Sequence, residues 1–207
     1  MLNALYKDID WSSITTVGFD MDGTLYDEYD FIKQVYSEIN TQLIQNNEIL
    51  LFMNQKWIEK GSSYPHIFDE AYERSNNISY SQEEFVKKAL YIFRNYKPRL
   101  FLSERNKTLL SYFQRNFKLF LITDGHYRLQ KNKFVSLKLS QYFDECNVIF
   151  TGEHSIEYHK PSTKSLEFIN LETDKSVFFG DRDLDREFAL SSNIQFKRVS
   201  NMIAVEA

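Results

Sequence analysis

Two aspartates separated by one residue, Asp20 and Asp22, stand directly after a β-prone run at residues 14–19, and Gly23 and Thr24 follow them. Side chains two positions apart in an extended segment share one side of the backbone, so these two carboxyl groups are crowded. Crowded carboxylates at the end of a buried strand share a proton, bind a cation, or do both, because an unpaired buried charge is costly. The pair therefore predicts an active site.

Three later segments add polar groups of complementary kinds at the ends of apolar runs or before a proline. They contain the residues Thr123, Asp124, Gly125, Lys160, Gly180, Asp181, Asp183 and Asp185. Carboxylates are ligands for a hard divalent cation, whereas Thr123 and Lys160 suit phosphate oxygens. Together with the first pair, these segments predict a site for a cation and a phosphate.

The elements that must position these residues alternate from residue 100 onward. Apolar, β-prone runs predict strands at 118–123, 147–151, 176–180 and 195–199, after the first strand at 14–19. Helices are predicted between them at 103–116, 127–137, 162–170 and 183–192. Short apolar strands separated by helices predict an α/β fold with a parallel sheet covered on both faces. Ligands bind beyond the carboxyl ends of such strands, where the polar segments lie.

A stretch of helical periodicity separates the first strand from the second. Apolar residues at helical spacing predict helices at 31–44 and 49–60, the second ending at Gly61. A third helix is expected from Pro65 toward Asn76, and a fourth behind a capping box of Ser81 and Glu84. We therefore expect an all-helical lobe at 26–99 inserted into a core domain of residues 1–25 and 100–207, with hinges near 25–28 and 97–100.

Composition excludes several classes of protein. The net charge of -4 gives no basic field for a nucleic-acid polymer, and the longest apolar run, at 49–53, is too short to span a membrane. A single cysteine, Cys146, rules out an internal disulfide and is expected as a small apolar residue in or near the core. The N-terminus shows no signal-peptide pattern. We expect a soluble, cytoplasmic monomer or homodimer.

The four polar segments, in this order, resemble the motifs of the haloacid dehalogenase (HAD) superfamily of phosphohydrolases. The first motif is similar to residues 20–25, the second to 121–125, the third to Lys160-Pro161, and the fourth to Gly180-Asp181 with Asp185. The resemblance runs from about Val17 to Val199. It implies a three-layer, Rossmann-like core with a helical cap inserted between the first two motifs, as the periodicity indicates.

The resemblance also implies a role for each residue. Asp20 would be an ionised nucleophile that forms an aspartyl-phosphate, and Asp22 would rest protonated, ready to act as acid and then as base. Mg²⁺ would be bound by Asp20, Asp181 and the backbone carbonyl of Asp22. Thr123, Lys160 and the backbone of Asp124 and Gly125 would hold the phosphate, while Asp185 would orient Lys160 or a water on the metal.

Other interpretations exist for several residues. Thr123 could cap the following helix, and Asp183 could cap its own helix or join the acids; the cap is favoured for Asp183. We interpret three histidines as polar loop residues: His126, His154 and His159.

The function expected is a Mg²⁺-dependent phosphatase acting on a small phosphorylated metabolite. A sugar phosphomutase shares the core motifs, and a phosphonate hydrolase would need a lysine such as Lys33, Lys56 or Lys60 as a Schiff base. Asp22 argues against a dehalogenase, and the intact acids argue against a non-catalytic binding relative. No glycine fingerprint of a dinucleotide-binding protein follows the first strand. Substrate choice is expected to depend on the helical lobe, with Lys56, Tyr64 and His66 as candidates.

Overall fold

The structure is a computed structural model that describes residues 2–62, 64–75, 79, 81–200 and 203–204. The chain divides into two compact units. The core unit comprises Met1–Glu28 and Leu100–Ala207, and the helical unit comprises Tyr29–Arg99. Each is described by itself.

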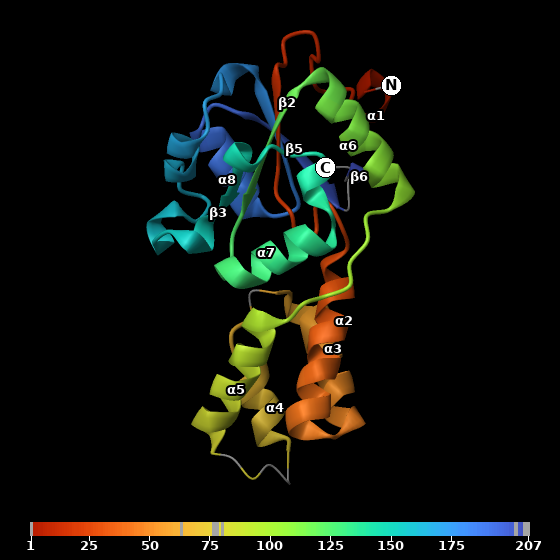
Figure 1. Ribbon diagram of the computed structural model, residues 1–207, viewed down its shortest axis with the longest axis vertical. Coiled ribbons are helices and arrows are strands. Elements are labelled where there is room, and N and C mark those ends of the chain that lie inside the picture. The colour runs from red at the N-terminus through yellow and green to blue at the C-terminus, as the bar shows by residue number, and fades with distance from the viewer. Residues whose placement is uncertain (1, 63, 76–78, 80, 201–202, 205–207) are drawn as a thin grey trace. The chain divides into compact units, whose positions relative to one another are not determined.

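A six-stranded sheet forms the centre of the core unit, in the order β3-β2-β1-β4-β5-β6 (Figure 1). The strands are β1 (Thr16–Phe19), β2 (Lys118–Thr123), β3 (Val148–Phe150), β4 (Ser176–Gly180), β5 (Gln195–Ser200) and β6 (Ile203–Ala204). The first five pair in parallel, which confirms the predicted parallel sheet. The antiparallel β6 was not predicted, because a two-residue strand has too little periodicity to detect.

One face of the sheet is covered by α6 (Glu104–Asn116) through aromatic side chains. Phe19 of β1 and Phe179 of β4 are aligned in register and stack with ring centroids 5.3 Å apart. Phe113 of α6 packs against both rings, at 5.7 and 5.6 Å. All three side chains are fully buried, so this face is part of the core.

The opposite face is covered by α8 (Asp183–Ser191). Phe178, which neighbours Phe179 and therefore points the other way, packs edge-on against Phe188 of α8 at 5.1 Å. Phe120 of β2 belongs to the same buried cluster. Helices on both faces of a parallel sheet confirm the predicted three-layer α/β architecture.

Gly18, in the middle of β1, leaves room for an aromatic ring on the α8 face. A Cβ atom at this position would lie 2.1 Å from the Phe120 ring, closer than any real contact. The ring therefore crosses over the bare backbone of β1, two residues before Asp20. Packing of this strand and placement of the first acid depend on the same glycine.

The remaining helices of the core unit are short. They are α1 (Leu2–Leu5), α7 (Tyr127–Ser136) and 3₁₀ turns at Leu139–Gln141, Glu145–Asn147, Thr151–Glu153, Ile156–Tyr158, Lys164–Phe168 and Thr173–Lys175. The helix predicted at 162–170 is thus a 3₁₀ turn and not an α-helix. The prediction for Cys146 was also wrong: it is exposed, because it lies in a turn that leads into the edge strand β3.

The helical unit contains four α-helices and a π-helical turn among its described residues. They are α2 (Glu28–Ile39), η1 (Asn40–Ile44), α3 (Asn47–Lys60), α4 (Ile67–Glu73) and α5 (Gln82–Asn95). The capping box is confirmed. Ser81 Oγ accepts a hydrogen bond from the backbone N–H of Glu84, and the backbone N–H of Ser81 donates to Glu84 Oε2. Gly61 ends α3 with a φ of 75°. The predicted limit of the third helix at Asn76 lies outside the described residues.

None of the helices described in either unit has the length and hydropathy needed to cross a membrane.

Gly18→Ala is expected to lower the free energy of unfolding of the core unit by about 1–3 kcal/mol, because the new methyl group overpacks the sheet against Phe120. The two tryptophans allow a clean measurement, since Trp11 lies in the core unit and Trp57 in the helical unit. Urea unfolding of a Trp57→Phe background, followed by Trp11 fluorescence, isolates the core transition.

Gly61→Ala is the control in the helical unit, because nothing lies within 4 Å of its added methyl group and the backbone strain of an alanine at a φ of +75° falls on that unit and not on the core unit. It should leave the Trp11 transition where it is. A Gly18→Ala transition that also stays in place would contradict the packing described for β1.

Candidate active site

The predicted site residues lie at the carboxyl ends of the parallel strands. Asp20 follows β1, Thr123 ends β2, and Asp181 follows β4. Strand β1 lies between β2 and β4, so the connections that leave β1 and β4 diverge at this point of the sheet. Such a switch point is the usual ligand site of an open α/β sheet.

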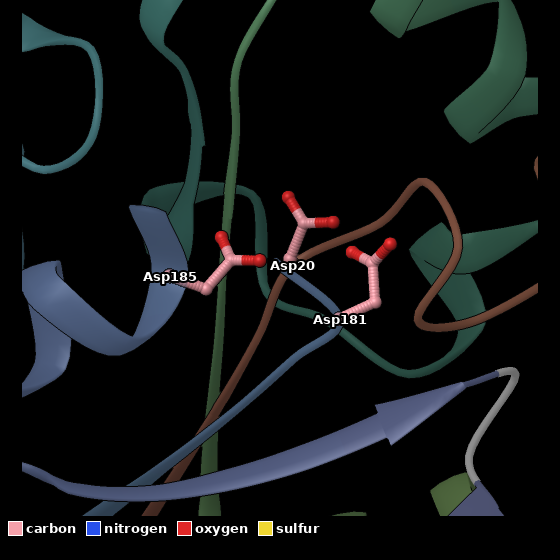
Figure 2. Close-up of side chains that lie close together, drawn as sticks. All are labelled: Asp20, Asp181 and Asp185. Atoms are coloured by element: carbon pink, nitrogen blue, oxygen red, sulfur yellow. The ribbon is translucent and has the colours of Figure 1, made fainter. Parts of the chain in front are cut away.

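Three carboxyl groups converge at this point. Oxygen atoms of Asp20, Asp181 and Asp185 all lie within 4.8 Å of one another. Figure 2 shows them approaching from the end of β1, the loop after β4 and the first turn of α8. Among the described residues this is the only such grouping of histidine, cysteine and acidic side chains, so no histidine joins it.

Two glycines make the approach of these acids possible. Gly23 has a φ of +73°, and a Cβ atom there would lie 2.4 Å from Oδ2 of Asp181. A Cβ atom on Gly180 would lie 2.4 Å from Cβ of Asp185. Any larger residue at either position would displace a carboxylate, which is why the motifs contain glycine beside their acids.

Lys160 is buried between two of the acids. Its Nζ donates to Oδ1 of Asp20 at 2.6 Å and to Oδ1 of Asp185 at 2.5 Å. Burial lowers the pKa of Lys160, but the charges of Asp20 and Asp185 outweigh it and hold the pKa above its ordinary value. The amine is therefore protonated, and the site carries a fixed cation next to the proposed nucleophile.

The loop that carries Lys160 is fixed by Asp124. Oδ1 of Asp124 accepts from Thr151 Oγ1 at 2.8 Å and from the backbone N–H of Lys160 at 3.3 Å. The Asp124 side chain thus holds protein groups, and only the backbone of Asp124 and Gly125 stays a predicted phosphate ligand. Thr123 does not cap α7, because that helix begins at Tyr127.

The Asp22 side chain faces α7. Its carboxylate accepts from Lys133 Nζ at 2.8 and 3.0 Å, from Gln130 Nε2 at 2.7 Å, and from the Tyr26 hydroxyl. Burial raises the pKa of Asp22, but the Lys133 charge and the hydrogen bonds from Lys133, Tyr26 and Gln130 leave it below its ordinary value. The expectation that Asp22 rests protonated was wrong for this state of the protein, because three donors stabilise the carboxylate.

The acidic cluster has the properties of a cation site. Oδ2 of Asp20 and Oδ1 of Asp181 are buried and accept no hydrogen bond from the described residues. Burial raises the pKa of Asp20 to about 8 and that of Asp181 to about 6. Arg182 contacts both acids only at 3.9 Å. A buried carboxylate oxygen without a partner on Asp181, next to two further acids, fits a hard divalent cation.

The side chains that form this cluster differ in one member from the predicted metal set. Asp20 and Asp181 belong to both, and Asp185 takes the third place in the cluster. The Asp22 side chain is bound to α7, so its predicted contribution through the backbone carbonyl remains a prediction.

Asp183 has neither of the roles considered for it. Its side chain is 82% exposed and pairs with Arg198 on β5. The start of α8 is stabilised by Asp185, whose Oδ2 accepts from the backbone N–H of Arg182 at 3.0 Å. Asp185 therefore supports the helix and Lys160 at once, because its position three residues after the N-cap lets it reach back.

Four residues around the site were not predicted from the sequence: Gln130, Lys133, Tyr26 and Arg182. A detectable signal existed for two of them. Gln130 and Lys133 stand at the spacing of the buried face of α7, beside Leu129 and Phe134. A lysine at a core position of a helix is rare unless it is paired, so this spacing indicates a buried partner.

The histidines have surroundings of their own. His154 stacks on Phe168 at 4.6 Å, and His126 precedes α7 without a side-chain cap to it. The interpretation of the histidines as loop residues accords with their absence from the acidic cluster of the described chain.

The fold and the site define an α/β protein with a charged ligand site at the switch point of a doubly wound parallel sheet. The chain matches the haloacid dehalogenase-like hydrolase family over residues 17–199, and it belongs to that family. The resemblance stated from the motifs is thereby confirmed, and the protein is an enzyme of the hydrolase class.

Individual relatives are more distant. The chain is 26% identical over 175 residues to a glyceraldehyde 3-phosphate phosphatase from Methanocaldococcus jannaschii, covering 79% of this chain and 75% of that protein. A Thermotoga maritima structure provisionally described as a β-phosphoglucomutase has a TM-score of 0.67 at 22% identity, over 94% of this chain and 87% of that one. A provisionally described Bacillus subtilis HAD hydrolase bound to magnesium has a TM-score of 0.63 at 14% identity, over 88% of this chain and 85% of that one.

Divalent-cation affinity is expected to rise with pH between about 6 and about 8, because Asp181 and Asp20 must lose their protons to bind it. The free energy of unfolding of the metal-free protein is expected to change with pH in the opposite direction. Raised carboxyl pKa values stabilise the metal-free fold at low pH, and this stabilisation is lost as the pH rises through about 6 and about 8. Calorimetric titration with MgCl₂ at both ends of the range, in two buffers, gives affinity and proton release.

Asp181→Asn should abolish most of this binding, whereas Asp183→Asn, outside the cluster, should bind like the wild type. An affinity that does not change with pH, without proton release, would contradict the protonation states assigned to the cluster.

Proposed function

We propose that the protein is a Mg²⁺-dependent phosphatase that hydrolyses a small phosphate monoester through an aspartyl-phosphate on Asp20. The observation that carries the proposal is the environment of the Asp20 carboxylate. Lys160 holds Oδ1 at 2.6 Å, while Oδ2 is buried and accepts no hydrogen bond from the described residues. A carboxylate with one oxygen fixed and the other without a partner is suited to attack an electrophile.

The relatives support a phosphate ester as the substrate. The Methanocaldococcus jannaschii relative is named for dephosphorylating a three-carbon sugar phosphate, and the Thermotoga maritima protein for moving a phosphate on glucose. Both names describe chemistry at a phosphate monoester. We therefore take a small phosphorylated metabolite as the substrate class for this chain.

The first half of the reaction transfers the phosphoryl group to the protein. Oδ2 of Asp20 forms a bond to phosphorus as the bond from phosphorus to the ester oxygen breaks. Asp22 gives its proton to the departing oxygen, so that an alcohol leaves. Asp22 is ionised before substrate binds, and a phosphate dianion beside it raises its pKa by like-charge repulsion, which favours the uptake of this proton.

The second half returns the protein to its starting state. Asp22, now a carboxylate, takes a proton from water while the water oxygen bonds to phosphorus. The bond from Asp20 to phosphorus breaks, and inorganic phosphate leaves. Each proton that Asp22 gives in the first half is thus recovered in the second.

The remaining residues stabilise charge. Lys160 is a fixed cation beside Asp20, and Thr123 can donate its hydroxyl hydrogen to a phosphoryl oxygen. Asp20 and Asp181, with Asp185 beside them, would hold Mg²⁺, which when bound offsets the repulsion between nucleophile and phosphate. Asp185 keeps Lys160 in place.

A phosphomutase is the second candidate, supported by the likeness to the Thermotoga maritima protein. It would return the phosphoryl group to another hydroxyl of the substrate and release no inorganic phosphate. The lysines considered for a phosphonate hydrolase fit less well. Lys33 pairs with Asp30 on the surface and Lys56 pairs with Glu70, and paired ammonium groups are poor Schiff-base nucleophiles.

Asp20→Asn is expected to abolish release of phosphate from an aryl phosphate, because an amide cannot form the acyl phosphate. Asp183→Asn is the matched control, since it makes the same substitution on an exposed acid that lies outside the acidic cluster. A malachite-green assay with MgCl₂ measures phosphate release by both variants. EDTA should abolish the activity of the wild type until Mg²⁺ is restored. Turnover by Asp20→Asn at the wild-type rate would refute the assignment.

Asp22→Asn should slow the first turnover of glyceraldehyde 3-phosphate by about 10²–10⁴-fold, because its alkoxide leaves only when protonated. Nitrophenolate leaves without a proton, so the first turnover of p-nitrophenyl phosphate should fall far less. Rapid-quench measurement of a single turnover separates the two. Equal losses for both esters would show that Asp22 is not the acid.

A further inference from the structure

The surroundings of Asp22 include two buried polar side chains on α7 that have no role in the proposed reaction. Gln130 and Lys133 are each 2% exposed, because they lie on the face of α7 that packs into the core. Burying an ammonium and an amide costs stability unless their partners are well placed. The presence of both side chains at core positions of α7 therefore indicates a role other than packing.

Gln130 connects the first two motifs. Its Nε2 lies 2.7 Å from Oδ2 of Asp22 and 2.7 Å from Oγ1 of Thr123. An ionised carboxylate only accepts, so the Gln130 atom that faces it is the amide nitrogen, with one hydrogen for each partner. The bond to Thr123 occupies a lone pair of that hydroxyl, and the hydroxyl hydrogen stays available for another acceptor.

Lys133 fixes the same carboxylate from the next turn of α7. Its Nζ spans both oxygens of Asp22, at 2.8 and 3.0 Å, and the side chains are 3% and 11% exposed. The Tyr26 hydroxyl adds a third donor from the segment that follows the first motif. A carboxylate held by three donors has one orientation, because rotation about its χ angles would break all of them.

We propose that Gln130 and Lys133 are positioning residues, which hold Asp22 and Thr123 in register for proton transfer at Asp22 and for phosphate binding at Thr123. This inference rests on the proposed phosphatase function. Gln130 donates to Asp22 and Thr123 and Lys133 pairs with Asp22, and neither of these partners belongs to the acidic cluster of Asp20, Asp181 and Asp185. Their effect on turnover therefore passes through Asp22 and Thr123.

The step most sensitive to Lys133 is hydrolysis of the aspartyl-phosphate. Water must lose a proton to Asp22 while it attacks phosphorus, so a carboxylate turned away from that water cannot assist. Transfer of the phosphoryl group from p-nitrophenyl phosphate to Asp20 needs no acid, because nitrophenolate is a stable leaving group. A variant without Lys133 should consequently form the phosphoenzyme normally and hydrolyse it slowly.

The test compares Lys133→Met with Lys131→Met, an identical substitution on the same helix at an exposed lysine, whose ammonium donates to the Tyr127 hydroxyl at 2.9 Å. With p-nitrophenyl phosphate and MgCl₂, Lys133→Met is expected to show a burst of nitrophenolate and a steady rate about 100-fold below the wild type. Acid quench and mass spectrometry should find phosphate on Asp20 in this variant. Lys131→Met should match the wild type in rate and show no accumulation.

A double-substitution cycle separates positioning from general loss of structure. Adding Lys133→Met to Asp22→Asn should change the steady rate of p-nitrophenyl phosphate hydrolysis by less than about twofold, because the carboxylate that Lys133 orients is then absent. The double variant also avoids an unpaired buried charge, so it folds even where Lys133→Met alone is destabilised. Gln130→Met provides a second single variant, which should show the burst and a raised KM through Thr123.

The outcomes are distinct. A burst in Lys133→Met with a non-additive double variant supports the inference. Equal rates for Lys133→Met and Lys131→Met, or additive losses in the double variant, overturn it while the phosphatase function stands. A wild type that releases no phosphate from p-nitrophenyl phosphate or glyceraldehyde 3-phosphate overturns the proposed function, and this inference with it.

Discussion

The burial of like charges is the constraint on which the core unit depends. Three carboxylates lie within 4.8 Å of one another, and a single buried ammonium, that of Lys160, bridges two of them. Buried carboxylates repel each other strongly at such distances unless a cation or a proton intervenes. Burial first, and the neighbouring carboxylates second, raise the pKa values of Asp20 and Asp181. A further cation, or protons on the acids, would therefore balance the charge of this site.

The second buried charge pair solves a different problem. Asp22 stands two residues from Asp20, yet its carboxylate is paired with Lys133 on α7 and takes no part in the acidic cluster. Adjacent acids therefore acquire opposite shifts of pKa, upward for Asp20 and downward for Asp22. Different environments for two neighbouring carboxyl groups are what a nucleophile and a proton carrier need. The crowding suggested by their spacing is relieved by the partners that each one has.

Periodicity and motif order were enough to predict the five parallel strands, the sheet type and the residues at the strand ends. These features depend on local patterns that survive in one dimension, such as the apolar run at 118–123 that ends in Thr123. The partners of Asp22 could not be predicted in the same way, because Gln130 and Lys133 lie more than a hundred positions along the chain. Asp183 was misjudged for a related reason: its ion pair with Arg198 forms only when α8 packs beside β5.

Asp185 has two partners at once, the backbone N–H at the start of α8 and the ammonium of Lys160. Secondary structure and chemistry are therefore thermodynamically linked at this residue. A substitution that removes the carboxylate frays the first turn of α8 and also releases the lysine, so lost turnover and lost stability arrive together. An engineer who wishes to alter the reaction without weakening the protein should leave Asp185 in place and work on neighbours that have a single partner.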